Sequence, residues 1–404
     1  MIWVGIDWSD QVWDYHALGP ARKALVVGQV KPGFSGMAEL FEKLEAHGHP
    51  SEIAVAIETK HGPAVQALLD RGYRVYPVNP RASQKFREAM HLAGDKTDPI
   101  DAETLARLLA TFHEKLHPLK PDAPEIVALR IACEDRLRLV KEHTAKLHEL
   151  NDLLKAYYPA VPGLFAEMDS QAALAFLEDF PTQDMMRTLT PTRLRGWLKR
   201  QGYPCPQRIP EMLEHLGRPV LPVAAHLQQA KRPRIRYLAR SLAALGEELR
   251  EREDQIKGDL DQLPEADWIR SLPGAGPALA PALLACVGRD KDRFAHVGQA
   301  RALFGTAPVT EQSGTWRYVH FRFGCWKFAR RTFHLFAASS LATCGWAREL
   351  YQRQRDRGHS HNQALRALAH KWVKIILALQ RTGQLYNEAV FRNSQRRDLL
   401  KATP

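Results

Sequence analysis

Four acidic residues in the N-terminal quarter of the chain have the types and places needed to hold metal ions. Asp7 ends a short apolar run, Glu58 follows another, and Asp98 and Asp101 stand three residues apart at the start of a helical pattern, where they share one face. Clustered carboxylates repel one another unless cations occupy the site. Mg²⁺, or Mn²⁺ in its place, takes oxygen ligands, and two ions can clamp the attacking and leaving oxygens of a phosphodiester. The four residues therefore predict metal-dependent phosphodiester chemistry.

The apolar pattern around these acids predicts an α/β domain. We expect strands at 2–6, 12–18, 24–30, 53–57 and 74–78, and helices at 34–47, 63–69, after Pro80, and from Asp98 to about 113. Three early strands followed by alternating helix and strand form the order of a ribonuclease-H-like sheet. The first and fourth strands are neighbours in such a sheet, so acids from three separate segments can converge.

Each acid taken alone has an ordinary explanation. Asp98 suits the first turn of a helix, where the macrodipole favours a negative charge, and Glu58 suits a solvated strand end. The combination on these elements favours the metal site. Asp10 is left out of the set, because its side chain would face away from Asp7 if the strand continued.

The composition favours a globular protein with a polyanionic partner. Of its 404 residues, 45% are hydrophobic and 25% charged, which predicts two or three domains with real cores. Lysine and arginine outnumber acids by 57 to 45, giving a net charge of +12, which suits nucleic acid. The five cysteines form no CxxC pair, and we see neither a signal peptide nor a membrane span. We expect a cytoplasmic, nucleoid-associated protein with no membrane partner.

Two heptad seams follow the α/β region. One runs from Leu129 to Leu154 and the other from Ile235 to Leu263, with a proline-rich helical insert at about 160–222 between them. The seams favour an antiparallel coiled-coil arm, or an arm that dimerises, over two amphipathic helices packed on a globular core.

The C-terminal part combines basic and aromatic residues. From Gln312 to Arg348 there is no acidic residue, and basic side chains that suit phosphates alternate with aromatic rings that either stack on bases or pack the core. The basic residues that we expect to contact nucleic acid are Arg317, Arg322, Lys327, Arg330 and Arg331. Gly274 and Gly276 lie in a turn like that of a helix-hairpin-helix, which leaves backbone amides open to a phosphate.

Three short segments resemble one known family. Gly5-Ile6-Asp7, Ile57-Glu58-Thr59 and the run from Lys96 to Ala102 resemble the DEDD-type transposases of the IS110 insertion-sequence family, which also contains pilin-gene invertases. The pattern that ends in Gln312-Ser313-Gly314 resembles the C-terminal domain of the same family.

The resemblance implies a fold and a reaction. The expected fold is α/β followed by all-α: a RuvC-like domain over 1–122, a helical coiled-coil arm over 123–264, and a mainly helical transposase domain over 265–404. The family's catalytic acids would be Asp7, Glu58, Asp98 and Asp101, and Ser313 would form a covalent phosphoserine link to DNA. A serine hydroxyl needs activation, which metal at the acids would supply if the domains meet across a dimer. The resemblance also implies a homodimer or homotetramer and a guide RNA.

Three other functions remain open at this point. A RuvC-type hydrolytic nuclease, such as a junction resolvase, would need the acids and water but not Ser313. A site-specific DNA invertase would use the same residues on a different arrangement of sites. A nucleic-acid-binding protein with a decayed site would bind without metal-dependent chemistry.

Overall fold

A computed structural model describes residues 1–59, 62–91, 97–120, 122–390 and 392 of the chain. The backbone divides into two compact units, Met1–Pro121 and Asp122–Pro404. Each unit is described by itself below. The division into three domains that the sequence suggests stays a prediction, because the second unit contains both the long helices and the C-terminal helices.

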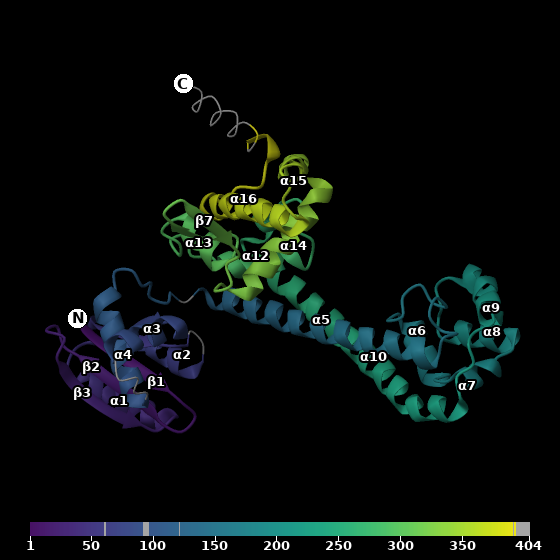
Figure 1. The fold of residues 1–404 in the computed structure, drawn as a ribbon, viewed down its shortest axis with the longest axis horizontal. Coiled ribbons are helices and arrows are strands. Elements are labelled where there is room, and N and C mark those ends of the chain that lie inside the picture. Colours follow the sequence, from purple (N-terminus) through teal and green to yellow (C-terminus); the bar gives the residue numbers. More distant parts are fainter. Residues whose placement is uncertain (60–61, 92–96, 121, 391, 393–404) are drawn as a thin grey trace. The chain divides into compact units, whose positions relative to one another are not determined.

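The first unit is built on a five-stranded sheet in the order β3-β2-β1-β4-β5 (Figure 1). Its central pair, β1 and β4, runs parallel, β5 is parallel to β4, and β2 and β3 are antiparallel neighbours on the other side. This mixed sheet confirms the predicted α/β region. The strands are β1 (Ile2–Trp8), β2 (Trp13–Leu18), β3 (Ala24–Val30), β4 (Ile53–Ile57) and β5 (Arg74–Pro77).

Helices cover both faces of this sheet. Ile2, Val4 and Ile6 of β1 pack in one core with residues of α1, and the alternate residue Trp3 packs in a second core with residues of α4, as the two-residue period of a strand requires. The helical elements of the unit are α1 (Phe34–Glu45), η1 (Pro50–Glu52), α2 (Pro63–Asp70), α3 (Pro80–Met90) and α4 (Asp98–Phe112).

Gly5 lets α4 lie unusually close to β1. A Cβ atom at Gly5 would stand 2.0 Å from the backbone oxygen of Ala102 and 2.5 Å from the backbone nitrogen of Ala106. No side chain fits in that space, so glycine is required at the crossing of strand and helix. The close crossing fixes the first turn of α4 beside the end of β1.

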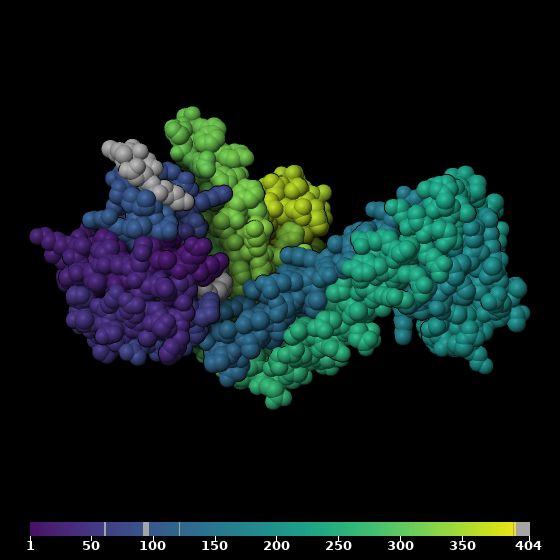
Figure 2. Space-filling view, turned by 90° about the horizontal axis from the view of Figure 1, so that it is seen from below, coloured from purple at the N-terminus to yellow at the C-terminus, as the bar shows by residue number. Residues whose placement is uncertain are grey.

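The second unit begins with one of two long helices that pair antiparallel. The helices α5 (Pro124–Tyr157) and α10 (Ala225–Asp261) lie side by side in both views (Figures 1 and 2). Ion pairs join Arg136 to Glu253 and Arg234 to Glu149, so the start of one helix lies beside the end of the other. The predicted seams are therefore helical, although α10 begins ten residues before Ile235 and contains Pro233 within its first turns.

A small helical cap packs at the far end of the long pair. Its core joins Leu150 and Leu154 of α5 to Leu238 and Leu242 of α10 through the buried rings of the insert, which include Phe176. This arrangement confirms the predicted helical insert. The cap elements are α6 (Gln171–Asp179), α7 (Gln183–Arg187), α8 (Pro191–Arg200), η2 (Pro206–Arg208) and α9 (Ile209–Gly217).

The C-terminal elements form a larger core with the near ends of α5 and α10. Leu129 of α5 and Ile256 of α10 belong to the same buried cluster as Phe304, Phe333 and Trp372. The elements are α11 (Ala266–Arg270), α12 (Leu279–Val287), α13 (Val297–Leu303), β6 (Val309–Ser313), β7 (Trp316–His320), α14 (Lys327–Thr343), α15 (Gly345–Asp356) and α16 (His361–Thr382). This part is mainly helical, as predicted, apart from the β6–β7 hairpin.

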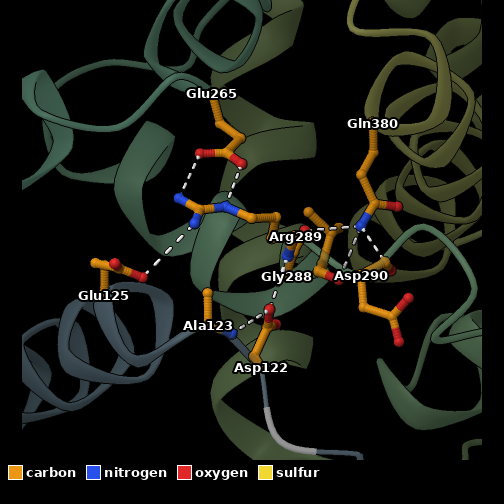
Figure 3. A network of polar contacts seen from close by, with 9 residues as sticks. Asp122, Ala123, Glu125, Glu265, Gly288, Arg289, Asp290 and Gln380 are labelled. Atoms are coloured by element: carbon orange, nitrogen blue, oxygen red, sulfur yellow. Dashed lines mark hydrogen bonds and ion pairs between the residues drawn. The ribbon is translucent and has the colours of Figure 1, made fainter.

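A polar network attaches α5 to this core (Figure 3). The Asp122 carboxylate accepts hydrogen bonds from the backbone N–H groups of Ala123 and Arg289, at 3.1 and 3.0 Å. Arg289 in turn binds Glu265 through two hydrogen bonds of 2.7 and 3.2 Å. Charge-assisted, two-point contacts of this kind fix orientation as well as distance, so the direction of α5 is tied to the C-terminal core.

Within the described part of the chain, no helix is long and apolar enough to cross a membrane.

Candidate active site

Asp7 and Glu58 lie on the same face and at the same edge of the sheet. Ile6 of β1 pairs with Ile57 of the parallel strand β4, so the next residue of each chain segment stands at the neighbouring carboxyl end. Asp7 shares the face of Gly5, which is the face that α4 covers. Glu58 shares the face of Ala56, which packs in the core of that same face. The predicted neighbourhood of the two acids is thus present in the sheet.

Asp98 and Asp101 stand in the first turn of α4, as predicted. Thr97 precedes the helix in an extended conformation, and the N–H of Asp101 donates a 3.0 Å hydrogen bond to the Thr97 carbonyl. Asp98 is exposed and Asp101 is half-buried. Since α4 crosses β1 closely at Gly5, this turn lies beside the sheet edge that carries Asp7.

The negative charges of the other acids act on the carboxyl group of Asp7. The pKa of Asp7 is raised to about 6, first by burial of its carboxyl group and then by the negative charges of Asp101, Asp98 and Glu58. Like charges disfavour ionisation of a neighbouring carboxyl group. The charges of Glu58, Asp98 and Asp101 therefore act on Asp7 from two other segments of the chain.

Helix α3 supplies polar partners to two of the acids. The Ser83 hydroxyl donates a hydrogen bond to the Glu58 carboxylate, and the Arg87 guanidinium forms an ion pair with Asp101. Ser83 is buried, and it also contacts the Pro80 carbonyl at 3.0 Å. These contacts hold Glu58 and Asp101 in place without a metal ion.

The chemistry of the donor set fits Mg²⁺ or Mn²⁺. All four side chains offer carboxylate oxygens, the ligands that these hard cations prefer. The pKa of Asp7 is raised by burial first and by the neighbouring negative charges second, and a cation would offset those charges. Among the described residues, no three or more His, Cys, Asp or Glu side chains are arranged closely enough to hold an ion. The acids share an edge of the sheet, but their side chains do not form a closed ligand set.

Ser313 lies at the tip of an exposed hairpin. It is the last residue of β6 and pairs with Trp316, the first residue of β7, across a two-residue turn. Gly314 in this turn has φ +57°, a conformation that glycine adopts without strain. Ser313 is exposed to solvent, and its hydroxyl contacts no acid that the structure describes.

An aromatic ladder runs along the face of the hairpin that carries Ser313. The Trp316 and Tyr318 rings stack with centroids 5.8 Å apart, and Tyr318 and His320 stack at 5.6 Å. Trp316 and Tyr318 are 55% and 53% exposed. The hydrogen bond that the His320 imidazole donates to the Glu311 carboxylate raises the pKa of His320. Exposed stacked rings of this kind suit unpaired bases.

The predicted basic residues divide into three groups. Arg317 and Lys327 are exposed on β7 and at the start of α14. Arg322 donates hydrogen bonds to the carbonyls of Ala307, at 3.2 Å, and Pro308, at 3.4 Å, which ties the two strands of the hairpin together at their base. Arg330 and Arg331 line one cavity.

The two glycines of the predicted helix-hairpin-helix turn have different surroundings. Gly274 has φ +83°, and a Cβ atom there would stand 2.8 to 2.9 Å from the backbone of Ser339 and Ser340 in α14. The Ser339 hydroxyl donates a 2.8 Å hydrogen bond to the Gly274 carbonyl. Gly276 is exposed, and no atom of the described residues lies within 4 Å of a Cβ atom built on it. Close packing of α14 therefore accounts for Gly274, whereas Gly276 is open.

Family comparisons match both regions that carry these features. A transposase family model matches residues 4–159, and a model of the transposase IS116/IS110/IS902 family matches residues 266–352, so together they cover more than half of the chain. The chain belongs to the IS110 family of transposases. The matched segments contain all four acids and Ser313.

Relatives of this IS110-family transposase match along almost the whole chain. A mini-circle protein of Streptomyces coelicolor named as a transposase for IS117 is 27% identical over 96% of this chain and 95% of its own length. A protein of insertion element IS116 from Streptomyces clavuligerus is 26% identical over 96% of each chain. A protein of insertion element IS110 from S. coelicolor is 26% identical over 95% of each chain. The chain is thus similar in length and order to whole insertion-element proteins.

Sequence reasoning missed one acid beside the site of this IS110-family chain. Asp14 of β2 is the cross-strand partner of Asp7, so their side chains share one face of the sheet. Asp14 is 3% exposed, accepts a 2.9 Å hydrogen bond from the Gln29 side chain, and contributes to the raised pKa of Asp7. A charged residue near the start of a mostly apolar strand is the signal that could have marked Asp14 as unusual, although the sequence does not show its partner.

Proposed function

We propose that this transposase cuts and rejoins DNA strands through a covalent phosphoserine ester at Ser313, with divalent cations held by Asp7, Glu58, Asp98 and Asp101. The observation that carries the proposal is the common face and edge of Asp7 and Glu58, beside the first turn of α4. We take the sheet to be RuvC-like on its strand order, in which β1 lies between the antiparallel β2 and the parallel β4.

The acids and their partners on α3 prepare the cation site. When bound, Mg²⁺ or Mn²⁺ would neutralise charge on the oxygens of the reacting phosphodiester. Glu58 is oriented by the Ser83 hydroxyl, and Asp101 is paired with Arg87, which a cation bound at Asp101 would displace. Hydrogen-bonded partners that orient a ligand in this way typically tune metal affinity about 10- to 100-fold.

Ser313 supplies the nucleophile in the proposed reaction. Its Oγ forms a bond to the phosphorus of a DNA phosphodiester, and the bond from that phosphorus to the leaving sugar oxygen breaks. The hydroxyl proton passes to water, because Ser313 is exposed, and the sugar oxygen takes up a proton as it leaves. The reverse attack by a sugar hydroxyl of another strand restores a phosphodiester and releases the serine. The covalent ester conserves the bond energy.

The long helices support an assembly of two or four protomers. Leu137, Val140 and Leu147 of α5 and Leu245 and Leu249 of α10 follow the heptad seam, yet all five are only half-buried by the two-helix pair. A coiled coil buries its seam in full when enough helices meet. We therefore propose that this stretch of the arm pairs with the same stretch of another protomer.

A guide RNA is the second proposed partner besides DNA. The support is the net charge of +12, which favours polyanions, together with the family resemblance. Extraction of nucleic acid from the purified protein, followed by ribonuclease and deoxyribonuclease digestion, tests this part separately. RNA of one defined sequence is expected, and purification without RNA from cells that transcribe the DNA flanking the gene contradicts it.

Substitution of Ser313 tests the central proposal. Ser313→Ala is expected to abolish the covalent protein–DNA adduct, which is read as a shifted band on a denaturing gel. Thr315→Ala is the control, because it removes a hydroxyl two residues away in the same exposed turn. The control variant is expected to form the adduct at the level of the unmodified protein.

The same experiment separates the alternatives. If the protein is a hydrolytic nuclease, the Ser313→Ala variant still cuts DNA, and neither the variant nor the unmodified protein forms an adduct. A decayed, non-catalytic protein would bind DNA but show no Mg²⁺-dependent cleavage in any variant. An invertase would form the adduct and yield inverted rather than transposed products.

A further inference from the structure

A cavity of about 280 Å³ lies where the C-terminal helices meet the base of the hairpin. Its walls come from the link after α13, from Phe321 directly after β7, from α14 and from α16. The lining residues are Gly305, Thr306, Phe321, Arg330, Arg331, His334, Asn362, Arg366 and Ala369. Small-molecule sites usually measure roughly 300–1,000 Å³, so this cavity suits one phosphate group and its ester oxygens.

The charge of the cavity is entirely positive. Three of its lining residues are arginines, and none of the lining residues that the structure describes is acidic. No described carboxylate forms an ion pair with Arg330, Arg331 or Arg366. Three guanidinium groups around one small space repel one another, and an anion in that space would relieve the repulsion.

Phe321 holds two of the arginines in position. The Arg330 guanidinium carbon lies 4.9 Å from the centre of the Phe321 ring, and that of Arg366 lies 5.0 Å from it. Stacking on an aromatic ring fixes the plane of a guanidinium and so prepares it for two-point binding to phosphate. One N–H of Arg330 donates a weak hydrogen bond to the Cys325 sulfur at 3.7 Å, and the other N–H groups of this guanidinium are not engaged in that contact. Burial lowers the pKa of Arg366, because its positive charge is partly removed from water. A bound anion would compensate for that lost solvation.

Neutral hydrogen-bonding groups complete the lining. His334 is hydrogen-bonded to Asn362, and burial is the main cause that lowers its pKa below the usual value. The imidazole and the amide therefore add polar groups without adding charge. This mixture of arginine and neutral donors is the set that phosphate oxygens accept from.

The cavity adjoins the base of the hairpin that carries Ser313. Phe321 follows the last residue of β7, and Arg322 joins that end to the start of β6 through the Ala307 carbonyl. Trp316, which pairs with Ser313, stands five residues before Phe321. At roughly 3.4 Å per strand residue, the serine lies about 17 Å from the cavity, which is about five base steps of duplex DNA.

We propose that Arg330, Arg331 and Arg366 form a pocket for one phosphate of the DNA backbone, which seats the strand near the hairpin that presents Ser313. This proposal rests on the proposed function for its choice of DNA. The pocket positions the nucleic acid and takes no part in the bond changes at Ser313.

The salt dependence of DNA binding tests the pocket. For a short random-sequence duplex, the logarithm of the binding constant is plotted against that of the salt concentration. Arg366→Gln is expected to reduce the magnitude of the slope by about 0.9, the value for one lost phosphate contact. Arg353→Gln is the matched control, because it removes one arginine from an exposed position on α15 outside the cavity. Equal slopes in the two variants overturn the proposal.

Two more measurements keep the result interpretable. Arg330→Gln is expected to lower the magnitude of the slope in the same way. Thermal unfolding shows whether each variant is folded. If the Arg366→Gln variant does not fold, the Arg330→Gln variant takes its place in the test. A loss of affinity for single-stranded RNA with unchanged DNA binding assigns the pocket to RNA and overturns the choice of DNA. Binding needs no adduct, so a lower slope in Arg366→Gln stands even if Ser313 proves inactive.

Discussion

The guanidinium of Arg87 and the carboxylate of Asp101 form an ion pair in which the side chains are only 17% and 20% exposed. This contact joins α3 to α4 at the acidic edge of the sheet. A cation bound by Asp101 would compete with Arg87 for the same oxygens, so the ion pair and a bound metal are alternatives.

Arg87→Gln is expected to lower the stability of the metal-free protein and to increase its response to Mg²⁺. Loss of a largely buried pair leaves Asp101 without a counter-charge, which costs about 1–3 kcal/mol. The measurement is the thermal midpoint with and without Mg²⁺. Arg81→Gln, at an exposed position of the same helix, is the control. An equal Mg²⁺ response in both variants would show that Arg87 does not compete with the ion.

Asp7→Asn is expected to stabilise the metal-free protein at pH 7. The folded protein keeps the Asp7 proton up to about pH 6, whereas the unfolded chain loses it near pH 4. The stability that comes from this shift is fully present below about pH 4 and is lost as the pH rises through 6. The asparagine variant avoids that loss, which amounts to about 1 kcal/mol once solvent screening of a half-buried group is allowed for.

Thermal unfolding in EDTA at pH 4 and pH 7 checks the sign of this effect. The Asp7→Asn variant is expected to be more stable than the unmodified protein at pH 7 and not at pH 4. With Mg²⁺ at pH 7, the unmodified protein should become the more stable of the two. Asp10→Asn, at an exposed position just after β1, provides the comparison. A variant that is less stable at pH 7 without metal would mean that the Asp7 carboxylate is stabilised rather than repelled by its surroundings.

Ser83→Ala is expected to raise the Mg²⁺ concentration needed for half-maximal DNA cleavage by roughly tenfold. The substitution removes the hydroxyl that orients Glu58 and leaves the carboxylate itself in place. DNA affinity without Mg²⁺ should not change. Gln84→Ala, which alters the exposed neighbour on α3, should leave the Mg²⁺ requirement as it is. If both substitutions act alike, the hydroxyl has no special role at the acids.

Gly274→Ala is expected to destabilise the protein by about 2–4 kcal/mol. The added Cβ would meet the backbone of α14 at less than 3 Å, in a residue with φ +83°, so overpacking and backbone strain add together. Gly276→Ala is the control because a Cβ there meets nothing, and its stability should change little. Chemical denaturation measures both. Similar losses at the two positions would contradict the packing role of Gly274.

Much of the first unit could be predicted because its residues repeat with simple periods. The buried strand of Ile53 to Ile57 has the predicted bounds, and the helix from Asp98 ends one residue before the predicted position. The acids converge because of sheet order, which follows from the order of strands and helices along the chain. Asp14 was missed since no local pattern tells that a buried acid pairs across strands with Asp7.

The C-terminal part was harder to predict for physical reasons. The run from Val309 to His320 is polar, basic and aromatic, and almost every residue in it is exposed, so it has no apolar face that would reveal a hairpin. Arg366 stands 35 residues after Arg331 in a different helix, and only tertiary packing puts both in one cavity. Patterns in sequence describe single elements, whereas shared pockets depend on how elements meet.

Among the residues that the structure describes, the hairpin that carries Ser313 has only two strands and pairs with no further strand. Two-stranded hairpins are marginally stable in water on their own, and β6 and β7 expose most of their side chains on both faces. An isolated protomer therefore displays Ser313, the proposed nucleophile, on a weakly supported hairpin. If Ser313 is the nucleophile, as proposed, a surface that packs against this hairpin would fix the direction of its hydroxyl, so that DNA strands would be broken only where such a surface is present.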